Sequence, residues 1–308
     1  MKKYTAIDIG GTKTKAIVFS EDREILYKSE CKGFGLPFDC EDDIPEYKSF
    51  LMDILRRYTP CSVAVNLGGR NCGQIEKITR EVFSSVPVKV FRESEGDVPI
   101  AFARIYGAEI ALLAGTGTIA VVSYREKKCI LGGWGMNISD AGSGYDIGLR
   151  AIKETLNALD STAPLSPLAC DICGFSEPLP MVDDAKEICR RRDEVRGRIN
   201  PFDRRCVASI AKKVAYHAER GEADALAYLR DAGMAMGDLA VCAARKACLE
   251  GGATIAVTGG LVNINDFWRE SFEQRIKEKI TDACVYYDND GVMKGVMELA
   301  VRISEEKG

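Results

Sequence analysis

Apolar residues along this chain recur with two periods, one typical of strands and one typical of helices. Short apolar runs between Gly, Asp or Asn residues indicate strands, whereas apolar residues three and four positions apart indicate helices. In the first third of the chain these patterns predict a three-stranded meander, a helix, two buried strands and a second helix, at residues 4–9, 14–19, 25–27, 46–58, 62–66, 86–91 and 97–106. A second meander is predicted at residues 110–114, 118–124 and 128–131.

The remainder of the chain is predicted to be mainly helical. Four helices are expected at residues 145–159, 182–191, 203–220 and 223–249, with a loop or small subdomain at residues 160–180. A strand at residues 254–258 is followed by a helix, a strand and a last helix at residues 265–280, 283–287 and 292–304. Strands that alternate with helices in this way predict the α/β class.

The two meanders carry the same kind of turn between their first two strands. Residues 7–26 align with residues 112–131 without a gap, and Gly10 falls opposite Gly115. Glycines leave room for main-chain N–H groups to approach phosphate oxygens, and Thr hydroxyls add donors. The repeat therefore predicts two similar subdomains whose turns clamp a polyphosphate from both sides. The alternative is a pair of ordinary hairpins.

Composition and charge narrow the class of protein. The chain has 308 residues, of which 46% are apolar, so it can form two domains with substantial cores. The formal net charge of −4 gives no electrostatic reason to expect nucleic acid or an anionic membrane as a partner. No stretch reaches the roughly 18 apolar residues of a membrane helix, and the first residues pass directly into a predicted strand. We therefore expect a cytoplasmic protein.

Cysteine and histidine offer few candidates for metal or redox chemistry. The twelve cysteines are expected to be reduced core residues. Only Cys170 and Cys173 form a C-x-x-C pair, and no second pair completes a zinc site, so metal or redox use is a minor alternative. The single histidine, His217, is predicted to lie at a partly exposed helix position. A Ser-His-Asp mechanism or a multi-histidine metal centre is therefore nearly excluded.

Three motifs occur in an order that resembles a known superfamily. Asp-x-Gly-Gly-Thr begins at Asp8, Gly-Thr-Gly-Thr at Gly115 and Thr-Gly-Gly at Thr258. They resemble the phosphate-1, phosphate-2 and adenosine motifs of the actin, sugar-kinase and Hsp70 superfamily. The segment Gly-Gly-Trp-Gly-Met-Asn-Ile-Ser-Asp-Ala-Gly-Ser-Gly-Tyr at residues 132–145 resembles one found in N-acetylglucosamine kinases and in the BadF/BadG/BcrA/BcrD ATPase group.

This resemblance implies a duplicated actin-like ATPase (ribonuclease H-like) fold of the α/β class, with two subdomains around a nucleotide cleft. The N-terminal subdomain is expected to span residues 1–108 with a C-terminal helix at about 292–308, and the C-terminal subdomain, with a helical insertion, residues 109–291. ATP and Mg²⁺ are the implied cofactors, with Asp8 on Mg²⁺. The implied nucleotide-binding residues are Gly10, Gly11, Thr12, Lys13, Gly115, Thr116, Gly117, Thr118, Gly259 and Gly260.

The resemblance also implies a catalytic base. Asp97 precedes small residues with the Asp-x-x-x-Ala spacing of these kinases, at the start of a predicted helix. A carboxylate there is expected to accept the proton of a sugar hydroxyl during phosphoryl transfer. The alternative is an Asp that only caps the helix. For Lys13 the alternative is a solvent-facing strand residue.

The acceptor site is implied in the same way. Trp134 is expected to offer a flat apolar face to a sugar ring and Asp140 to accept hydrogen bonds from its hydroxyls, with Gly68, Gly69 and Gly135 in loops near the sugar. The alternative for Trp134 is a core anchor. Two features depart from the N-acetylglucosamine kinases, because residues 31–40 contain no Asn and Asp140 is followed by Ala rather than Glu. These departures leave the identity of the acceptor open.

We therefore predict an ATP-dependent sugar kinase, a phosphotransferase with an alcohol group as acceptor, that phosphorylates an amino sugar such as N-acetylglucosamine or glucosamine. A homodimer is expected. The alternative is an ATPase activator that drives electron transfer to a partner dehydratase or reductase and holds an iron-sulfur cluster between subunits. We match none of the cysteine contexts of such activators, and the segment 132–145 favours the kinase. A degenerate binding protein is a third alternative, which Asp8, Asp97 and both turns disfavour.

Overall fold

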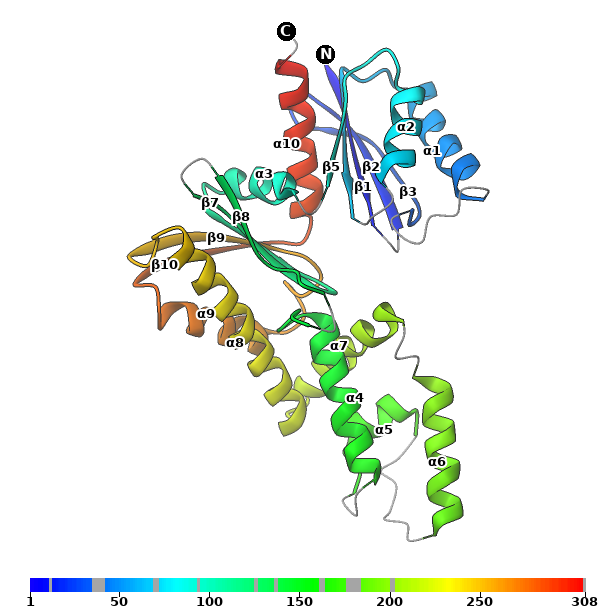
Figure 1. Cartoon of the computed structure of the whole chain (residues 1–308), viewed down its shortest axis with the longest axis vertical. Coiled ribbons are helices and arrows are strands. Elements are labelled where there is room, and N and C mark those ends of the chain that lie inside the picture. Colours follow the sequence, from blue (N-terminus) through cyan, green and yellow to red (C-terminus); the bar gives the residue numbers. More distant parts are fainter. Residues whose placement is uncertain are drawn as a thin grey trace. The chain divides into compact units, whose positions relative to one another are not determined.

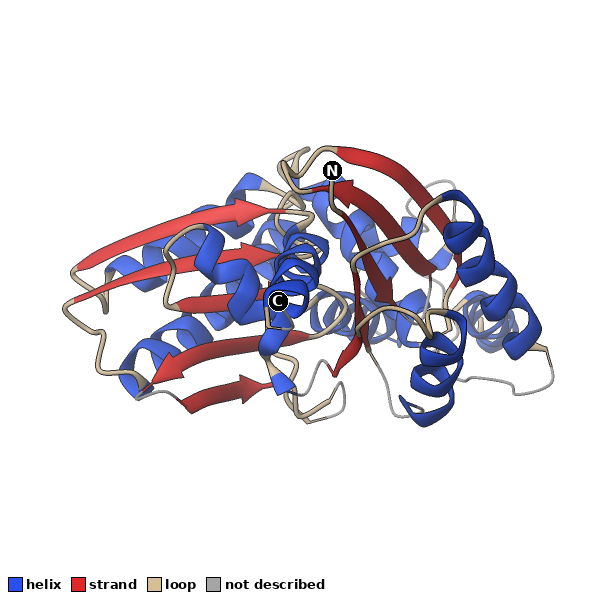
Figure 2. Ribbon diagram, turned by 90° about the horizontal axis from the view of Figure 1, so that it is seen from above, coloured by secondary structure: helices blue, strands red, loops and turns tan. Residues whose placement is uncertain are grey.

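The computed structural model of this protein describes residues 1–10, 13–34, 42–68, 72–92, 95–124, 127–135, 138–160, 164–175, 184–199 and 203–306. The chain divides into two compact units, unit 1 (Met1–Ala108 and Asp290–Gly308) and unit 2 (Glu109–Asn289). Each unit contains one five-stranded mixed sheet with helices (Figure 1), and the strands are seen from above in Figure 2. None of the described helices has the length and apolar content needed to span a bilayer.

The sheet of unit 1 has the strand order β3-β2-β1-β4-β5. The central strand β1 pairs antiparallel with β2 and parallel with β4. At the edges, β3 pairs antiparallel with β2, and β5 pairs parallel with β4. The strands are β1 (Lys3–Ile9), β2 (Lys13–Ser20), β3 (Ile25–Lys32), β4 (Ser62–Leu67) and β5 (Val88–Arg92).

Helices cover both faces of this sheet. Helices α1 (Asp43–Arg57) and α2 (Cys72–Val82) lie on one side, and α3 (Asp97–Ile105) and α10 (Gly291–Glu305) on the other (Figure 1). Because side chains alternate along a strand, Ile7 and Ile9 of β1 pack in the core with α1 and α2, whereas Tyr4 and Ala6 pack with α3 and α10. Because both faces of the sheet are covered, every residue of β1 is buried or half-buried.

Unit 2 repeats the same sheet and adds a larger helical layer. Its strand order is β10-β9-β6-β7-β8, with β6 pairing antiparallel to β7 and parallel to β9. The strands are β6 (Ile110–Ala114), β7 (Thr118–Tyr124), β8 (Lys127–Gly132), β9 (Gly252–Thr258) and β10 (Asp282–Asp288). The helices are α4 (Gly144–Asp160), α5 (Pro167–Cys173), α6 (Ala185–Arg198), α7 (Arg204–Ala218), α8 (Ala223–Lys246) and α9 (Asp266–Lys277).

The two sheets confirm the predicted duplication, since β3-β2-β1-β4-β5 corresponds strand by strand to β8-β7-β6-β9-β10. The gapless alignment is wrong beyond the turn, however. Ile9 is paired with Thr14, whereas Ala114 is paired with Thr118, so the first turn is longer by one residue. Thr14 and Thr118 are therefore equivalent, and both are buried. A register slipped by one residue would reverse the faces of the strand and place the exposed Lys13 inside.

His217 contradicts its prediction, because it is buried in unit 2. Its Nδ1 forms a short hydrogen bond with Glu222, and its Nε2 lies 3.3 Å from Oδ2 of Asp171 on α5. Lys213 donates to the other carboxylate oxygen of Asp171 at 2.8 Å. The helical pattern places His217 on the inner side of α7, and two carboxylates that no sequence pattern predicts satisfy its ring nitrogens.

Candidate functional site

In unit 1, an aspartate and an asparagine lie side by side near the carboxyl ends of two parallel strands. Asp8 of β1 is paired in register with Asn66 of β4, and Asn66 Nδ2 donates to Asp8 Oδ1 at 2.8 Å. The Asn66 Oδ1 atom is buried and has no hydrogen-bond partner among the described residues. Burial raises the pKa of Asp8, against the opposing effects of Asn66 and Lys15. An oxygen without a partner beside a half-buried carboxylate suits a hard cation such as hydrated Mg²⁺.

The turn after β1 is only partly described. Gly10 donates its N–H to Lys13 O at 3.0 Å, and Gly11 and Thr12 lie outside the described residues. Lys13 forms an ion pair with Glu30 at 3.4 Å, and both side chains are about half exposed. The structure thus places Lys13 in a surface pair on the first residue of β2.

Asp97 is the first residue of α3 and is half-buried. The preceding residue, Gly96, occupies the N-cap position with a left-handed φ of 71°, and as a glycine it has no side chain to cap the helix. Asp97 is therefore not the N-cap, although a carboxylate in the first turn still interacts favourably with the helix dipole. The following residues, 98–103, are all buried, so α3 holds the Asp97 backbone on a packed element.

In unit 2 the turn at residues 115–117, which we call the phosphate-2 turn, is built against the start of α4. Gly115 N donates to Gly117 O at 3.0 Å. Gly144 N and Tyr145 N donate to the carbonyls of Gly115 and Thr116, at 2.8 and 3.3 Å. In the described part of the chain, the N–H groups of Thr116 and Gly117 have no hydrogen-bond partner. Two such donors beside the positive end of a helix form a concavity suited to phosphate oxygens.

Thr118 follows this turn but directs its hydroxyl elsewhere. The residue is buried, and its Oγ1 donates to Ala141 O at 3.3 Å. This hydrogen bond ties β7 to the loop before α4, whereas Thr116 is exposed on the turn itself.

The residues at the start of α4 form a reciprocal helix cap. Ser143 Oγ accepts the N–H of Asp146 at 3.1 Å, and Asp146 Oδ2 accepts the N–H of Gly142 at 2.9 Å. Gly142 has a φ of +75°, and a Cβ there would collide with Ala232 O of α8. The Gly-Ser-Gly-Tyr sequence thus supports the helix end beneath the phosphate-2 turn.

Asp140 lies against the phosphate-2 turn, in an ion pair that the sequence does not predict. Its carboxylate is 3% exposed, and Oδ2 accepts from Arg204 Nη2 at 3.0 Å. A Cβ built on Gly117 would lie 2.9 Å from the same Oδ2 and would collide with Arg204 Nη2. No local motif could have identified Arg204, because it is 64 residues from Asp140 in the chain and begins α7.

Trp134 is 74% exposed, so it is not a core anchor. The nearby Ile138 is 79% exposed, whereas the other tryptophan of the chain, Trp268, is fully buried. Among the other predicted acceptor residues, Gly68 donates its N–H to Ile9 O at 3.1 Å. The carbonyl of Gly135 accepts from the N–H groups of Ile138 and Ser139, each at 3.0 Å. Gly69 lies outside the described residues.

The predicted adenosine motif follows β9. Gly259 has a φ of +114°, and a Cβ there would lie 2.5 Å from Ala114 O, so only glycine allows this approach to the end of β6. Leu261 N donates to the same carbonyl at 2.9 Å. A Cβ on Gly260 would meet nothing within 4 Å.

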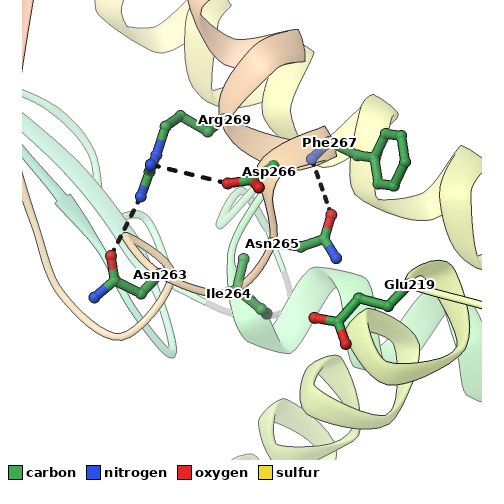
Figure 3. Close-up of a pocket in the computed structure, with 7 residues that line it drawn as sticks. All are labelled: Glu219, Asn263, Ile264, Asn265, Asp266, Phe267 and Arg269. Atoms are coloured by element: carbon green, nitrogen blue, oxygen red, sulfur yellow. Dashed lines mark hydrogen bonds and ion pairs between the residues drawn. The ribbon is translucent and has the colours of Figure 1, made fainter.

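A pocket of about 430 Å³ opens just after this motif (Figure 3). Its lining residues are Glu219, Asn263, Ile264, Asn265, Asp266, Phe267 and Arg269. Asn265 Oδ1 caps α9 by accepting from Phe267 N at 2.9 Å, which leaves its amide nitrogen directed away from the helix end (Figure 3). Amide and carboxylate groups beside an aromatic ring are the donors, acceptors and apolar surface that a small polar ligand needs. The sequence analysis did not identify these residues.

The chain is similar to two amino-sugar kinases. Over 184 residues, 57% of this chain, it is 26% identical to N-acetylmuramic acid/N-acetylglucosamine kinase of Clostridium acetobutylicum, and the match covers 60% of that protein. Over 61 residues, 20% of this chain, it is 41% identical to a glucosamine kinase of Vibrio cholerae, of which 20% is covered. In both relatives the matched stretch is thus less than two thirds of the length.

Solved structures with the same fold cover almost the whole chain. A candidate N-acetylglucosamine kinase from Chromobacterium violaceum has a TM-score of 0.64 at 21% identity, covering 97% of this chain and 99% of that one. A ROK family glucokinase from Streptomyces griseus, in complex with glucose and AMPPNP, has a TM-score of 0.63 at 14% identity with the same coverage. Component A of (R)-2-hydroxyglutaryl-CoA dehydratase from Acidaminococcus fermentans has 0.50 at 11% identity, covering 99% of each chain.

These structures and the two repeated sheets confirm the predicted actin-like α/β fold. The sequence model of one ATPase family matches residues 6–297, which leaves only a few residues at either end outside the match. Such coverage agrees with the resemblance of the segment 132–145. The chain belongs to the BadF/BadG/BcrA/BcrD ATPase family.

Proposed function

We propose that this protein is an ATP-dependent kinase that phosphorylates a hydroxyl of an amino sugar such as N-acetylglucosamine or glucosamine. The observation that carries the proposal is the phosphate-2 turn, whose Thr116 and Gly117 N–H groups have no partner among the described residues and which lies at the start of α4. The two curated relatives, both amino-sugar kinases, support the class of acceptor.

Asp97 is the proposed general base. The oxygen of the acceptor hydroxyl forms a bond to the γ-phosphorus while the bond from that phosphorus to the bridging oxygen of ADP breaks. The hydroxyl proton passes to a carboxylate oxygen of Asp97. Its place at the first position of the packed helix α3 supports this role, because a base must hold its carboxylate in a fixed position.

Asp8 and Asn66 are the proposed Mg²⁺ site. The half-buried carboxylate of Asp8 and the Asn66 Oδ1 without a partner among the described residues supply oxygen ligands, directly or through water. When bound, Mg²⁺ would neutralise charge on the phosphates. Asn66 orients Asp8 by donating to Oδ1, which leaves Oδ2 for the cation or its water.

The pocket after β9 is the proposed nucleoside site. The Asn263 and Asn265 amides can pair with a base edge, the Phe267 ring can pack against the base, and the Glu219 carboxylate can accept hydrogen bonds from ribose hydroxyls. Gly259 and Gly260 begin the segment that leads into this pocket.

For the acceptor, the exposed ring of Trp134 is the proposed platform, and Gly68, Gly69 and Gly135 are proposed as further acceptor-binding residues. The predicted role of Asp140 with ring hydroxyls stays a prediction, and its buried carboxylate is paired with Arg204.

The test is ATP consumption over a panel of amino sugars, N-acyl sugars and neutral hexoses, with wild type and Asp97→Asn. We expect one amino sugar to stimulate turnover, and Asp97→Asn to lower that turnover by roughly 10²- to 10⁴-fold at unchanged ADP affinity. Asp224→Asn is the matched control, because Asp224 also lies in the first turn of a helix, α8. Near-normal turnover of Asp97→Asn would remove Asp97 from the mechanism. Stimulation by a redox partner and by no sugar would replace the kinase with an activator.

A further inference from the structure

We infer that Arg204 binds phosphate oxygens of the nucleotide at the phosphate-2 turn, as a cation supplied by the helical layer of unit 2. The inference rests on the proposed function for its nucleotide, and it assigns a role to a residue outside the motifs of the chain. Arg204 is the first residue of α7.

The position of the guanidinium is the first argument. A Cβ on Gly117 would collide with Arg204 Nη2, so the guanidinium lies directly on the turn, next to the Gly117 N–H that has no partner among the described residues. A phosphate oxygen that accepts from this N–H would therefore lie within reach of the arginine as well. The fork of an arginine matches the geometry of phosphate oxygens.

The hydrogen-bond capacity of Arg204 is the second argument. A guanidinium has five N–H donors, and within the described residues Arg204 uses one nitrogen, Nη2, on Asp140. Its side chain is 45% exposed, whereas that of Asp140 is 3% exposed. The buried carboxylate thus holds one side of the guanidinium, and the other donors remain available to a ligand.

The support of Arg204 from its own helix is the third argument. Asp203 caps α7 by accepting from Arg205 N at 2.8 Å and Cys206 N at 3.3 Å, which fixes the point where the helix begins. Arg204 is thus held at both its backbone and its side chain before any ligand binds. Such preorganisation reduces the entropy lost when an anion is bound.

An anionic group on the acceptor is the other anion that Arg204 could meet. The contact with Gly117 favours the nucleotide, because Thr116 and Gly117 add two N–H donors at the same place, and three converging donors suit a phosphate better than a carboxylate. The acceptor is therefore an outcome that the test must separate.

The test compares a neutral replacement of this ion pair with a neutral replacement of another. Arg204→Gln with Asp140→Asn keeps a hydrogen bond between side chains of similar size and removes both charges, so no buried charge is left without a partner. The matched control is Arg150→Gln with Asp231→Asn, since Arg150 and Asp231 form an exposed ion pair between α4 and α8. Arg204→Lys tests whether the charge alone suffices.

The measurements are affinities for AMP, ADP and AMPPNP by titration calorimetry, and sugar-dependent turnover. For Arg204→Gln with Asp140→Asn we expect AMPPNP affinity to fall about 10- to 100-fold, because the charge-assisted hydrogen bonds from Arg204 to the outer phosphates are lost. AMP lacks these outer phosphates, so its affinity should stay within about twofold of wild type. Arg204→Lys should recover part of the loss, and the control pair should bind all three nucleotides like wild type.

Unchanged AMPPNP affinity would overturn the inference. An equal loss for AMP and AMPPNP would also overturn it, because it would indicate a general structural effect. A rise in the acceptor KM alone, seen in Arg204→Lys with Asp140 intact, would assign Arg204 to the acceptor instead. If no sugar stimulates turnover of the wild type, the proposed function fails, while the nucleotide affinities still decide the role of Arg204.

Discussion

Replacing His217 with alanine tests whether the buried cluster around it stabilises the helical layer of unit 2. His217 on α7 contacts Asp171 of α5 and Glu222 before α8, and Glu222 Oε2 also accepts the N–H of Leu168 at 3.1 Å. One imidazole therefore connects two helices and the segment that precedes a third. Alanine would leave Glu222, whose side chain is 19% exposed, without its histidine partner.

The expected cost follows from these contacts. A hydrogen bond to a charged group contributes about 1.5–3 kcal/mol. The contact of His217 with Asp171 should contribute no more than the lower limit of this range, since the Asp171 side chain is 41% exposed and retains its hydrogen bond from Lys213 in the variant. We therefore expect His217→Ala to lower the free energy of unfolding by about 2–4 kcal/mol. For a domain of the size of unit 2 this corresponds to a fall of roughly 4–16 °C in Tm.

The pH dependence of this cluster has a definite sign. Burial alone would raise the pKa of Asp171, but the hydrogen bonds and charges of Lys213 and His217 outweigh it, and the pKa lies below its ordinary value of 3.8. The folded state therefore binds this proton less tightly than the unfolded state. The ionised Asp171 carboxylate therefore contributes its full stabilisation above the unfolded pKa, and this stabilisation is lost as the pH falls through the folded pKa. The stability gap between wild type and His217→Ala should narrow in that acidic range.

The assay is urea unfolding followed by circular dichroism at neutral and acidic pH. Lys212→Ala is the control, because Lys212 is an exposed neighbour on the same helix. His217→Gln should lie between wild type and His217→Ala, since it retains one hydrogen bond to a carboxylate. If His217→Ala unfolds at the same urea concentration as Lys212→Ala, the cluster does not stabilise the layer and the reasoning is refuted.

Three further predictions concern the candidate site. Burial raises the pKa of Asp8, so the stability of the folded state falls as the pH rises from the unfolded to the folded pKa of this group. Asp8→Asn should therefore raise the Tm of the metal-free protein at neutral pH and remove the Mg²⁺ dependence of ADP binding, and a lower Tm would contradict this. Gly115→Val should fold normally, since a Cβ there meets only Gly117 O at 3.9 Å, but should weaken ADP binding at least about tenfold by calorimetry, with Gly251→Val as control. Trp134→Ala should raise the acceptor KM and leave ADP affinity unchanged, and the reverse pattern in a coupled assay would assign Trp134 to the nucleotide.

The sequence was sufficient for the fold class because the fold depends on local patterns repeated twice. The apolar run of β1 and the turn at Gly115 are readable from neighbouring residues, and the duplication supplies a second, independent instance. Helices α2 and α5 were missed. For α5 a start signal was present, since Ser166 caps the helix ahead of Pro167. The one-residue difference between the turns was also missed, because strand register is set by burial and not by the best sequence alignment.

The site was predictable only where a motif is contiguous. Gly117 and Gly259 lie in such motifs, and a Cβ at either position would collide with a neighbouring atom, which explains the glycine. Arg204 and Asn66 act through partners 64 and 58 positions away, and only the packing of helices or the pairing of β1 with β4 brings them there. The partners of His217 could not be predicted for the same reason, since both carboxylates come from outside α7.

The position of α10 in the chain has a consequence for synthesis. The helix covers the face of β1 and β4 where Val296 and Ala300 pack with Tyr4 and Ala6, yet it begins after the whole of unit 2 has been made. At roughly 5–20 residues per second, the residues of Glu109–Asn289 take about 10–40 s to translate. During that interval the ribosome-bound N-terminal segment has an apolar sheet face without its cover, whereas unit 2 is continuous in sequence and can fold as soon as it emerges. The unit that begins first is therefore the unit that is completed last.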